Sequence, residues 1–547
     1  MNKRIIYILL IFSSLFSEAQ LAPNTYWIQF TDKNGTDFSL YHPDDYLSLR
    51  SINRRLQYSI AFDSLDIPVN SFYLDSLVKK GATIVHASKW LNGAAVYTED
   101  SSVLSAIYDL SFVDESVSIS SAYAMNFSPR IPVSNITQIN DDYYDYGIGL
   151  NQIDLHHGQV LHNNGFRGQG MEIAIIDAGF QNIDQVPAFD SLFINNQIIG
   201  TWDFVSNDTN VYDDHYHGKA VLSTIAANLP GELIGTAPKA KFLLLRSENA
   251  SSEYKIEEIN WIAAAEYADS IGVDIITTSL GYNNYTPPST SYTWDNIDGQ
   301  TAPITKATDI AFSRGMFLVT SAGNEGNKSW KKITCPADAN NALTVGACTS
   351  NGDYASFSSR GYSKDGRVKP DVMAQGASTS VITSTTPTTG NGTSFSTPLT
   401  AGLVACLWQV NKSKTNLEIL NLIKKYSSQF SNPDSIMGYG IPNFEAAYND
   451  LSQNIEAVKA NRNQILNVYP TVFNNQITIK YYSVQSSMLS AEIISINGSL
   501  IFKKNYEVDS NRVNLLKINE LENFWSGLYV LRIINNDFVD TRKIVKP

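Results

Sequence analysis

The chain has 547 residues, a length that suggests about three to four folded domains. Hydrophobic residues make up 43% of it, which is enough for packed cores and excludes a largely disordered chain. The 53 acidic and 40 basic side chains give a net charge of −13, which argues against general binding to nucleic acid. The three cysteines are too few for a disulfide-stapled scaffold, although Cys335 and Cys348 could form one bridge.

The first residues have the pattern of a secretory signal peptide. The basic pair Lys3-Arg4 precedes an apolar run, Ile5–Phe16, and Ser17-Glu18-Ala19 fits a small-x-small cleavage site. The alternative is a transmembrane anchor, which would need roughly 20 apolar residues, and this run has about 12. We therefore expect residues 1–19 to be removed and the mature protein to be exported.

Residues 20–122 mix strand and helix patterns, as in a small α+β domain. Strands are expected at Tyr26–Phe30, Ala94–Tyr97 and Ser111–Val117, and helices at Tyr46–Gln57, Ser71–Lys80 and Ser101–Tyr108. Residues 123–150 are rich in Asn, Ser, Pro, Asp and Tyr and show no periodicity, which indicates a linker and the start of the mature chain.

Residues 151–452 alternate short apolar runs with helical patterns. Strands are expected at Met171–Ile176, Phe242–Leu245, Val273–Thr277, Met316–Thr320 and Ala342–Val345, with helices such as Ile256–Ser270 and Ile304–Arg314 between them. This alternation predicts an α/β domain, a parallel sheet with helices on both faces. Such a sheet collects its active site at the carboxyl ends of the strands.

The last part of the chain changes character. After a linker at 453–465, residues 466–547 show short strands separated by turn signals, and we predict a small all-β sandwich. Its strands are expected at Ile477–Ile479, Ala491–Ile494 and Tyr529–Ile533.

Three segments of the α/β domain place side chains suited to acyl transfer at the ends of predicted elements. Asp177 ends a buried strand, and His217 lies at or near the start of the apolar helix 221–227. Ser394 precedes the helix Leu399–Trp408, so unpaired backbone N–H groups surround it. Serine acyl transfer needs a nucleophile, a base and a carboxylate that orients the base, and Ser394, His217 and Asp177 suit these roles.

The same chemistry needs donors that face the developing oxyanion. Asn324 follows a predicted strand and is the candidate side-chain donor, although it could instead only cap a turn. His215 and His217 form an H-x-H pair that could bind a metal ion, but no other motif in the sequence offers a third ligand. We therefore expect no catalytic metal and no required cofactor.

Four other residues are expected to have no role in catalysis. His156, His157 and His162 are predicted to lie on the surface of a helix. Cys406 lies on an apolar helix face and is predicted to be a small buried side chain. The loop 282–300, rich in Tyr, Asn, Pro and Ser, either flanks the substrate cleft or is an inert surface loop.

The order Asp, His, Ser is that of the subtilisins. Asp177-Ala178-Gly179 resembles the D-[ST]-G box, His217-Gly218 with Val221 resembles HGTHVAG, and Gly392–Pro398 resembles GTSMA-x-P. Four further segments resemble boxes of the same family in the same order: Ser279-Leu280-Gly281, Cys335-Pro336-Ala337, Phe357-Ser358-Ser359 and Lys369-Pro370-Asp371-Val372. The middle of the chain therefore resembles the subtilisin-like (subtilase, S8 family) serine peptidases.

This resemblance implies a subtilisin-like α/β fold and a secreted serine endopeptidase that uses Asp177, His217 and Ser394, with Asn324 in the oxyanion hole. It also implies that Ser279, Leu280 and Gly281 bind the substrate by strand addition. Alternatively, these three residues are only the end of a core strand and have no role in binding. Subtilases often bind calcium, and a structural calcium site stays open and unplaced in this sequence.

Some residues depart from the family boxes. Lys219 and Ala220 replace Thr and His after His217-Gly218, and Ala178 replaces Ser or Thr. These departures motivate a second hypothesis, a surface-displayed and catalytically weak binding protein that kept the fold. The complete Asp-His-Ser set favours the enzyme.

The flanking regions also have family resemblances. Residues 20–122, with Arg54-Arg55 and Ser88–Asn92, resemble the propeptides of secreted Bacteroidetes subtilases, which assist folding and inhibit the enzyme. The C-terminus resembles a type IX secretion sorting domain through Val468-Tyr469-Pro470, Ile496-Asn497-Gly498 and Ser526–Leu531. The partners implied are protein or peptide substrates, the enzyme's own propeptide and the type IX secretion machinery, with secretion or attachment to the outer surface.

Overall fold

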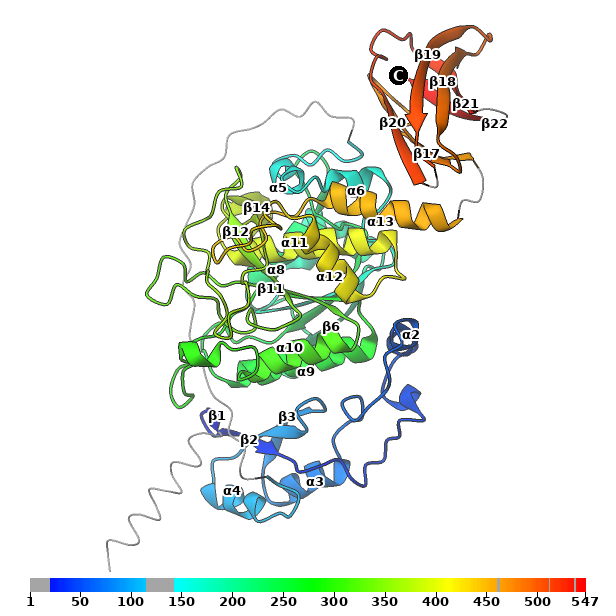
Figure 1. The fold of residues 1–547 in the computed structure, drawn as a ribbon. Helices are drawn as coiled ribbons and strands as arrows, with labels where there is room; N and C mark the ends of the chain where they lie inside the picture. The colour runs from blue at the N-terminus through cyan, green and yellow to red at the C-terminus, as the bar shows by residue number, and fades with distance from the viewer. Residues whose placement is uncertain (1–19, 115–141, 460–462, 511, 536–537) are drawn as a thin grey trace, which may run out of the picture. The chain divides into compact units, whose positions relative to one another are not determined.

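The computed structural model describes residues 20–114, 142–459, 463–510, 512–535 and 538–547 (Figure 1). The expected signal peptide, residues 1–19, and most of the expected linker 123–150 lie outside these residues. The described residues form two compact units: residues 20–114, 145–158 and 167–443 make up the first, and residues 142–144, 159–166 and 444–547 the second. Within the described residues, the longest and most apolar helices still fall short of what a membrane span requires.

The first part of the first unit is the expected α+β domain. Its antiparallel sheet has the order β1-β2-β4-β3, with β1 at Gln20–Ala22, β2 at Thr25–Gln29, β3 at Thr83–Ser88 and β4 at Gly93–Tyr97. Helices α3 (Ser71–Lys79) and α4 (Ser101–Tyr108) pack on this sheet through one core that includes Ile28, Leu77 and Ile107. Asn70 and Asp100 cap these helices by accepting from backbone N–H groups.

The prediction of a strand at Ser111–Val117 is wrong for the part of it that the structure describes, residues 111–114. Val113 makes only an isolated bridge to Phe30, and the chain beyond residue 114 is outside the description. The expected helix Tyr46–Gln57 is shorter than predicted: it is preceded by the 3-10 turn η1 (Pro43–Asp45), and α2 spans Leu49–Gln57. Ser48 begins α2 because its side chain accepts from the Ser51 N–H.

The second part of the first unit is built on a parallel sheet of seven strands in the order β13-β12-β11-β10-β5-β9-β6. The strands are β5 (Glu172–Asp177), β6 (Ile198–Asp203), β9 (Lys241–Arg246), β10 (Ile275–Thr278), β11 (Phe317–Ser321), β12 (Leu343–Cys348) and β13 (Val372–Gln375). The central strands are buried on both faces, as their unbroken apolar runs predict.

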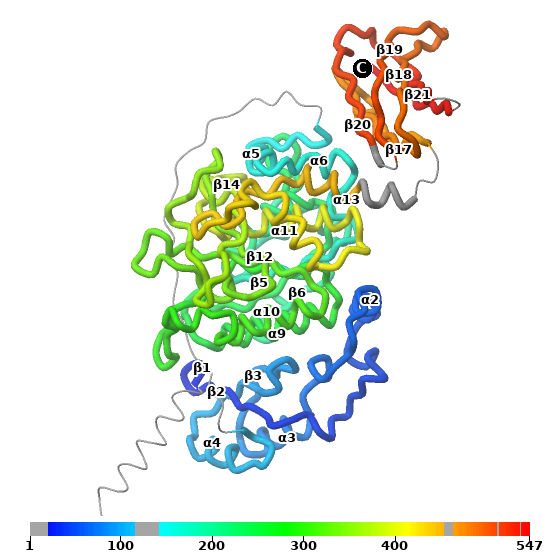
Figure 2. Tube along the Cα trace, in the orientation of Figure 1, coloured from blue at the N-terminus to red at the C-terminus, as the bar shows by residue number. Residues whose placement is uncertain are grey.

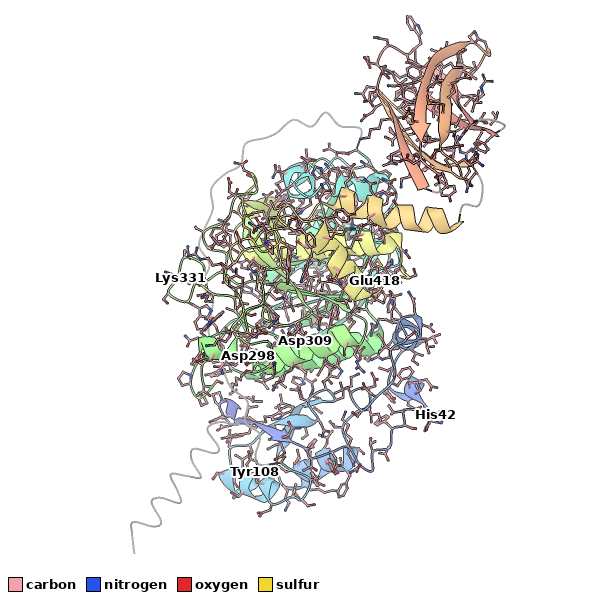
Figure 3. All side chains as sticks on the ribbon, viewed as in Figure 1. His42, Tyr108, Asp298, Asp309, Lys331 and Glu418 are labelled. Atoms are coloured by element: carbon pink, nitrogen blue, oxygen red, sulfur yellow. The ribbon has the colours of Figure 1, made fainter. Side chains whose placement is uncertain are left out.

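Helices cover both faces of this sheet. Helices α9 (Ile256–Ile271) and α10 (Pro303–Ser313) cover one face, and α8 (His217–Ala226) and α11 (Thr393–Val410) cover the other (Figures 1 and 2). Asp298 accepts from the Thr301 N–H at 2.7 Å and shapes the turn that enters α10 (Figure 3). The predicted α/β architecture is confirmed.

Shorter elements complete the first unit. They are α5 (Leu150–Asp154), η2 (Ile183–Gln185), η3 (Pro187–Phe189), α7 (Asp190–Ile194), β7 (Asn228–Leu229), β8 (Leu233–Ile234), η4 (Trp294–Asn296), β14 (Thr379–Ile382), β15 (Pro387–Gly390) and α12 (Asn416–Lys425). The pairs β7-β8 and β14-β15 are antiparallel.

The second unit contains α6 (Gln159–Asn163), α13 (Phe444–Lys459) and an all-β region of two antiparallel sheets. One sheet has the order β16-β17-β20 and the other β19-β18-β21-β22, and both contribute to one apolar core. The strands are β16 (Gln464–Tyr469), β17 (Ile477–Ser483), β18 (Ser487–Ser495), β19 (Leu500–Val508), β20 (Arg512–Ile518), β21 (Gly527–Asn535) and β22 (Phe538–Lys546). Residues 453–459, expected to begin a linker, continue α13.

Candidate active site

Asp177 is the last residue of β5 and is fully buried. Its Oδ1 accepts from the Ala178 N–H at 2.8 Å. Gly179 then turns the chain away with a φ of 134°, and a Cβ there would lie 2.8 Å from the His215 backbone nitrogen. Only glycine suits this turn, which brings the loop before α8 against the end of β5.

His217 is the first residue of α8 and points its Nδ1 at Asp177 Oδ1, 2.7 Å away. Gly218 makes this approach possible, because a Cβ there would lie 2.4 Å from the Gly179 carbonyl oxygen. Burial lowers the pKa of His217, but the charge of Asp177 and its hydrogen bond outweigh burial, so the pKa is raised above its ordinary value.

Ser394 is the second residue of α11 and is almost completely buried. Its Oγ donates to the Ser279 carbonyl oxygen at 3.4 Å, and Ser279 Oγ donates to the Ser394 carbonyl oxygen at 2.9 Å. Thr278 pairs with Ile176, so Ser279 lies next to Asp177 at the sheet edge. The structure thus brings all three residues of the predicted triad to the carboxyl end of β5.

The residue after Ser394 also links α8 and α11. The ring of Phe395 lies beside the ring of His217, with centroids 6.3 Å apart, and packs against Ala220 of α8. Ala220 and its neighbour Lys219 are both buried in α8. These two departures from the family box therefore leave the Asp177–His217 hydrogen bond in place.

Asn324 follows β11 and lies against the start of α11. Its Oδ1 accepts from the Thr393 N–H at 2.9 Å and from Thr393 Oγ1 at 3.1 Å. Because the amide oxygen of Asn324 is held by Thr393, the residue before Ser394, its amide NH2 group remains free to donate elsewhere.

Ser279, Leu280 and Gly281 follow β10 directly. Besides the bonds of Ser279, the Leu280 carbonyl accepts from Ser321 Oγ at 2.9 Å. A Cβ on Gly281 would lie 2.4 Å from Thr334 Oγ1, so this segment is tightly packed. Through Ser279, the segment lies beside Ser394.

Glu248 was not among the residues predicted from sequence. It is buried just past the end of β9, and its Oε1 accepts from Ser247 Oγ at 2.8 Å and from the Tyr282 hydroxyl at 2.6 Å. Burial raises the pKa of Glu248 to about 7, and the charge of Asp177 adds to the rise. A carboxylate after a buried strand was the signal available in the sequence.

Arg246 was missed as well. This last residue of β9 is buried, and its Nη1 lies 2.6 Å from Asp203 Oδ2 and 2.9 Å from Asp214 Oδ2. Its Nε donates to the Glu248 carbonyl oxygen at 3.1 Å. Arg246 thereby ties the loop that precedes His217 to two strands of the sheet.

Loop 282–300 is anchored by buried side chains. Tyr285 and Tyr292 donate to Glu258 Oε1 of α9 at 2.9 and 3.1 Å, and Ser289 Oγ donates to the Leu21 carbonyl of β1 at 2.8 Å. The loop is therefore packed on the enzyme and touches the N-terminal domain.

The expectation for His156 and His162 is wrong. His156 is fully buried, and its Nδ1 donates to the Pro442 carbonyl at 3.1 Å; burial lowers its pKa to about 4. His162 is also buried, with its ring edge-on to Tyr144, whereas His157 is exposed as predicted. His156 lies in the turn between α5 and α6, where it packs against the segment that contains Pro442, and His162 lies on α6.

The three cysteines are free and buried, so Cys335 and Cys348 form no bridge. The prediction that Cys406 is buried is confirmed. Among the described residues, no group of three or more His, Cys, Asp or Glu side chains is arranged to hold a metal ion.

Three family models match the chain. The subtilase family (Peptidase S8) matches residues 168–440, the Bacteroidota Peptidase S8 propeptide domain matches 25–135, and the secretion system C-terminal sorting domain matches 467–547. These matches coincide with the α/β part, the N-terminal α+β part and the all-β part of the structure.

Individual relatives agree with the family models. Subtilisin Savinase of Lederbergia lenta is 32% identical over 289 residues, covering 53% of this chain and 94% of that protein. Subtilisin E of Bacillus subtilis (strain 168) is 29% identical over 385 residues, covering 68% of this chain and 85% of that protein. The crystal structure of MycP1 from the ESX-1 type VII secretion system covers 58% of this chain and 90% of that chain at 20% identity, but its TM-score of 0.43 is too low to add to the assignment.

The chain belongs to the subtilase family of serine peptidases. It is a subtilisin-like serine endopeptidase with a Bacteroidota-type propeptide domain before the catalytic domain. Its C-terminal sorting domain marks it for export, to be secreted or held at the surface.

Proposed function

We propose that this protein hydrolyses peptide bonds through an acyl-enzyme formed on Ser394. The observation that carries the proposal is the buried hydrogen bond between His217 Nδ1 and Asp177 Oδ1, 2.7 Å long, at the sheet edge where Ser394 lies. Asp177 holds the Nδ1–H tautomer, so Nε2 of His217 is the basic nitrogen.

The reaction then follows in two halves. Ser394 Oγ attacks the scissile carbonyl as His217 Nε2 takes its proton, and the imidazolium gives that proton to the leaving amine. Water next attacks the acyl-enzyme, gives its proton to His217, and the acid product leaves as Ser394 regains a proton. In each half, the amide of Asn324 and the Ser394 N–H at the start of α11 stabilise the oxyanion.

The substrate chain is proposed to lie along Ser279, Leu280 and Gly281. These residues follow β10 and lie beside the nucleophile, so an extended peptide added there would pass its carbonyl over Ser394. Substrates are therefore protein or peptide segments that can adopt an extended strand.

We further propose that the propeptide inhibits the enzyme until it is shed and that the type IX secretion machinery receives the sorting domain. The matched propeptide and sorting domains support these partners.

No cofactor is needed in this scheme, because Ser394, His217 and Asp177 supply the nucleophile, base and orienting carboxylate. We assign no position to a structural calcium ion. Adding a chelator should therefore leave the turnover of the folded enzyme unchanged.

The deciding experiment is labelling with a fluorophosphonate serine probe, followed by mapping of the modified residue. Processed enzyme should be labelled on Ser394, and Ser394→Ala should not be labelled. Ser396→Ala is the matched control, because Ser396 lies two positions further along α11 and only donates to the Thr393 carbonyl. An unlabelled Ser394 in folded protein free of its propeptide would overturn the proposal in favour of a binding protein.

A further inference from the structure

One segment of the propeptide domain stands apart from its sheet. We call residues 43–66 the α2 arm; it contains η1, α2 and the turn that ends at Asp66. Figures 1 and 2 show α2 separated from α3 and α4. The arm binds where two helices of the catalytic domain, α9 and α10, both end.

The α2 arm caps both of these helices. The last carbonyl groups of an α-helix have no partner within the helix. Ser48 supplies two donors at α9: its N–H bonds the Ser270 carbonyl at 2.9 Å and its Oγ bonds the Ile271 carbonyl at 2.6 Å. Arg54 Nε donates to the Arg314 carbonyl just after α10 at 3.1 Å, and its Nη2 donates to the Asp269 carbonyl in the last turn of α9 at 3.3 Å. One cation therefore lies at the negative ends of two helix dipoles.

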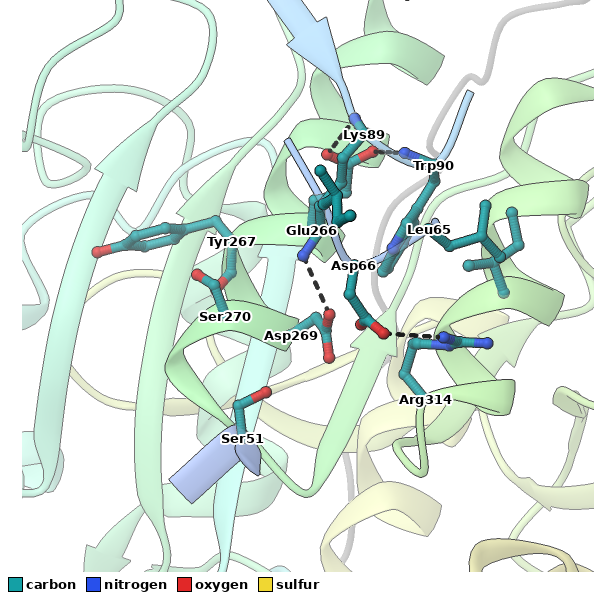
Figure 4. A network of polar contacts seen from close by, with 12 residues as sticks. Ser51, Leu65, Asp66, Lys89, Trp90, Glu266, Tyr267, Asp269, Ser270 and Arg314 are labelled. Carbon is teal, nitrogen blue, oxygen red and sulfur yellow. Dashed lines mark hydrogen bonds and ion pairs between the residues drawn. The ribbon is translucent and has the colours of Figure 1, made fainter. Parts of the chain in front are cut away.

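The arm also neutralises a buried carboxylate of the catalytic domain. Asp269 of α9 is fully buried and lies 2.5 Å from Arg54, 2.9 Å from Arg55 and 3.2 Å from Lys89. Figure 4 shows Lys89 reaching Asp269 from the propeptide sheet. Burial by itself would raise the pKa of Asp269, but these three cations outweigh it and lower the pKa. Within the described residues, every cation paired with Asp269 comes from the propeptide.

Ion pairs continue in both directions across the interface. Arg55 also pairs with Asp66 of the arm at 2.5 Å, and Asp66 lies 3.3 Å from Arg314 of the catalytic domain (Figure 4). At the rim, the partly exposed Arg50 lies 2.6 Å from Asp274. Buried ion pairs therefore run from Asp269 through Arg55 and Asp66 to Arg314, and a further pair between the domains lies at the rim.

We propose that the ends of α9 and α10, together with Asp269, form a docking surface for an arginine-bearing helix, and that the α2 arm bound there sets how long the cut propeptide stays on the enzyme. The inference rests on the proposed function, in which the propeptide inhibits. Separation leaves Asp269 without its cations, and breaking buried pairs of this kind is strongly unfavourable. Arg54 and Arg55 are buried in the complex, so this dibasic pair is shielded from proteases until the arm leaves.

The test measures release rather than catalysis. The full chain carries Ser394→Ala and, between residues 123 and 150, the recognition sequence of a site-specific protease. After the cut, release of the propeptide fragment is followed by size-exclusion chromatography from roughly 0.05 to 1 M NaCl. Because every sample lacks Ser394, the result does not depend on whether that residue is the nucleophile.

Three substitutions test whether contacts of the α2 arm, rather than the loss of any positive charge, control the release of the fragment. Arg55→Ala should release the fragment at least about tenfold faster, since truncating one partner of a buried charge pair acts mainly on dissociation. Arg50→Ala, at the rim, should give a smaller acceleration and a weaker dependence on salt, and it serves if Arg55→Ala does not fold. Lys79→Ala removes an exposed charge from α3 and should stay within about twofold of the parent. Release of Arg50→Ala and Arg55→Ala at the parent's rate and salt dependence would overturn the proposal.

Discussion

His217 Nδ1 lies 2.7 Å from Asp177 Oδ1, although the two residues are 40 positions apart in the chain. Two glycines make this contact feasible. Gly179 turns the chain at the end of β5, and Gly218 lets α8 begin against the Gly179 carbonyl, where a Cβ would lie only 2.4 Å away. The buried hydrogen bond is therefore a product of backbone approach as much as of the two side chains.

Asp177→Asn should keep the fold and lose most of the activity. Asparagine can donate to Nδ1 and favour the wrong imidazole tautomer, so kcat should fall by about 10⁴-fold with a small change in KM. Steady-state hydrolysis of a peptide substrate measures this, with circular dichroism to confirm folding. A loss below tenfold would contradict the orienting role of Asp177.

The activity should depend on pH through His217. Only the neutral imidazole accepts the Ser394 proton, and Asp177 raises the pKa of His217, so kcat/KM should fall as pH drops through a midpoint above about 6.5. The charge of Glu248 also raises this pKa, and because burial raises the pKa of Glu248 to about 7, the two groups titrate in the same pH range. Glu248→Gln should therefore move the midpoint to lower pH, by less than about one unit. A midpoint that moves upward would show that Glu248 acts on His217 in another way.

Asn324→Ala should lower kcat by about 10²- to 10³-fold with KM nearly unchanged, because an oxyanion donor acts mainly in the transition state. Asn351→Ala, at an exposed position, is the matched control and should leave both constants unchanged. If Asn324→Ala raised KM and left kcat alone, its amide would bind the ground state instead.

Arg246→Met should destabilise the catalytic domain. The buried Asp203 would lose the cation that lies 2.6 Å away, and Asp214 would lose the same cation, 2.9 Å away. The free energy of unfolding should therefore fall by about 3–5 kcal/mol. Urea unfolding followed by tryptophan fluorescence measures the loss. Lys306→Met on the exposed side of α10 should shift the curve by less than about 0.5 kcal/mol, and an equal shift for both variants would refute the argument.

The thiols should be inert in the native protein. All three cysteines are buried and free, and burial raises the pKa of Cys348 to about 12. A thiol-specific chromogenic reagent should detect none of the three until denaturant is added. Rapid reaction of native protein would contradict this burial, and detection of only one thiol after unfolding would indicate a disulfide.

Residues with a strong local context were predictable. Asp177 ends an apolar run, and Ser394 precedes a helix, so each carries a signal within a few neighbours. Glu248 and Arg246 carry weaker signals, because their roles depend on contacts with Tyr282, Asp203 and Asp214, which lie elsewhere in the sequence. His156 looked like a surface residue because its burial comes from packing beneath a distant segment near Pro442.

The sequence by itself determined the class of fold, the order of the parts and the candidate residues for the triad, since periodicity, turn residues and short boxes are local properties of a chain. Only the tertiary structure decided which charges meet. Arg54 and Arg55 resemble ordinary polar residues of a surface helix in the sequence, yet they are buried against Asp269, more than 200 positions away. The physical reason is that a buried carboxylate needs cations close by, and the fold alone sets which ones can reach it.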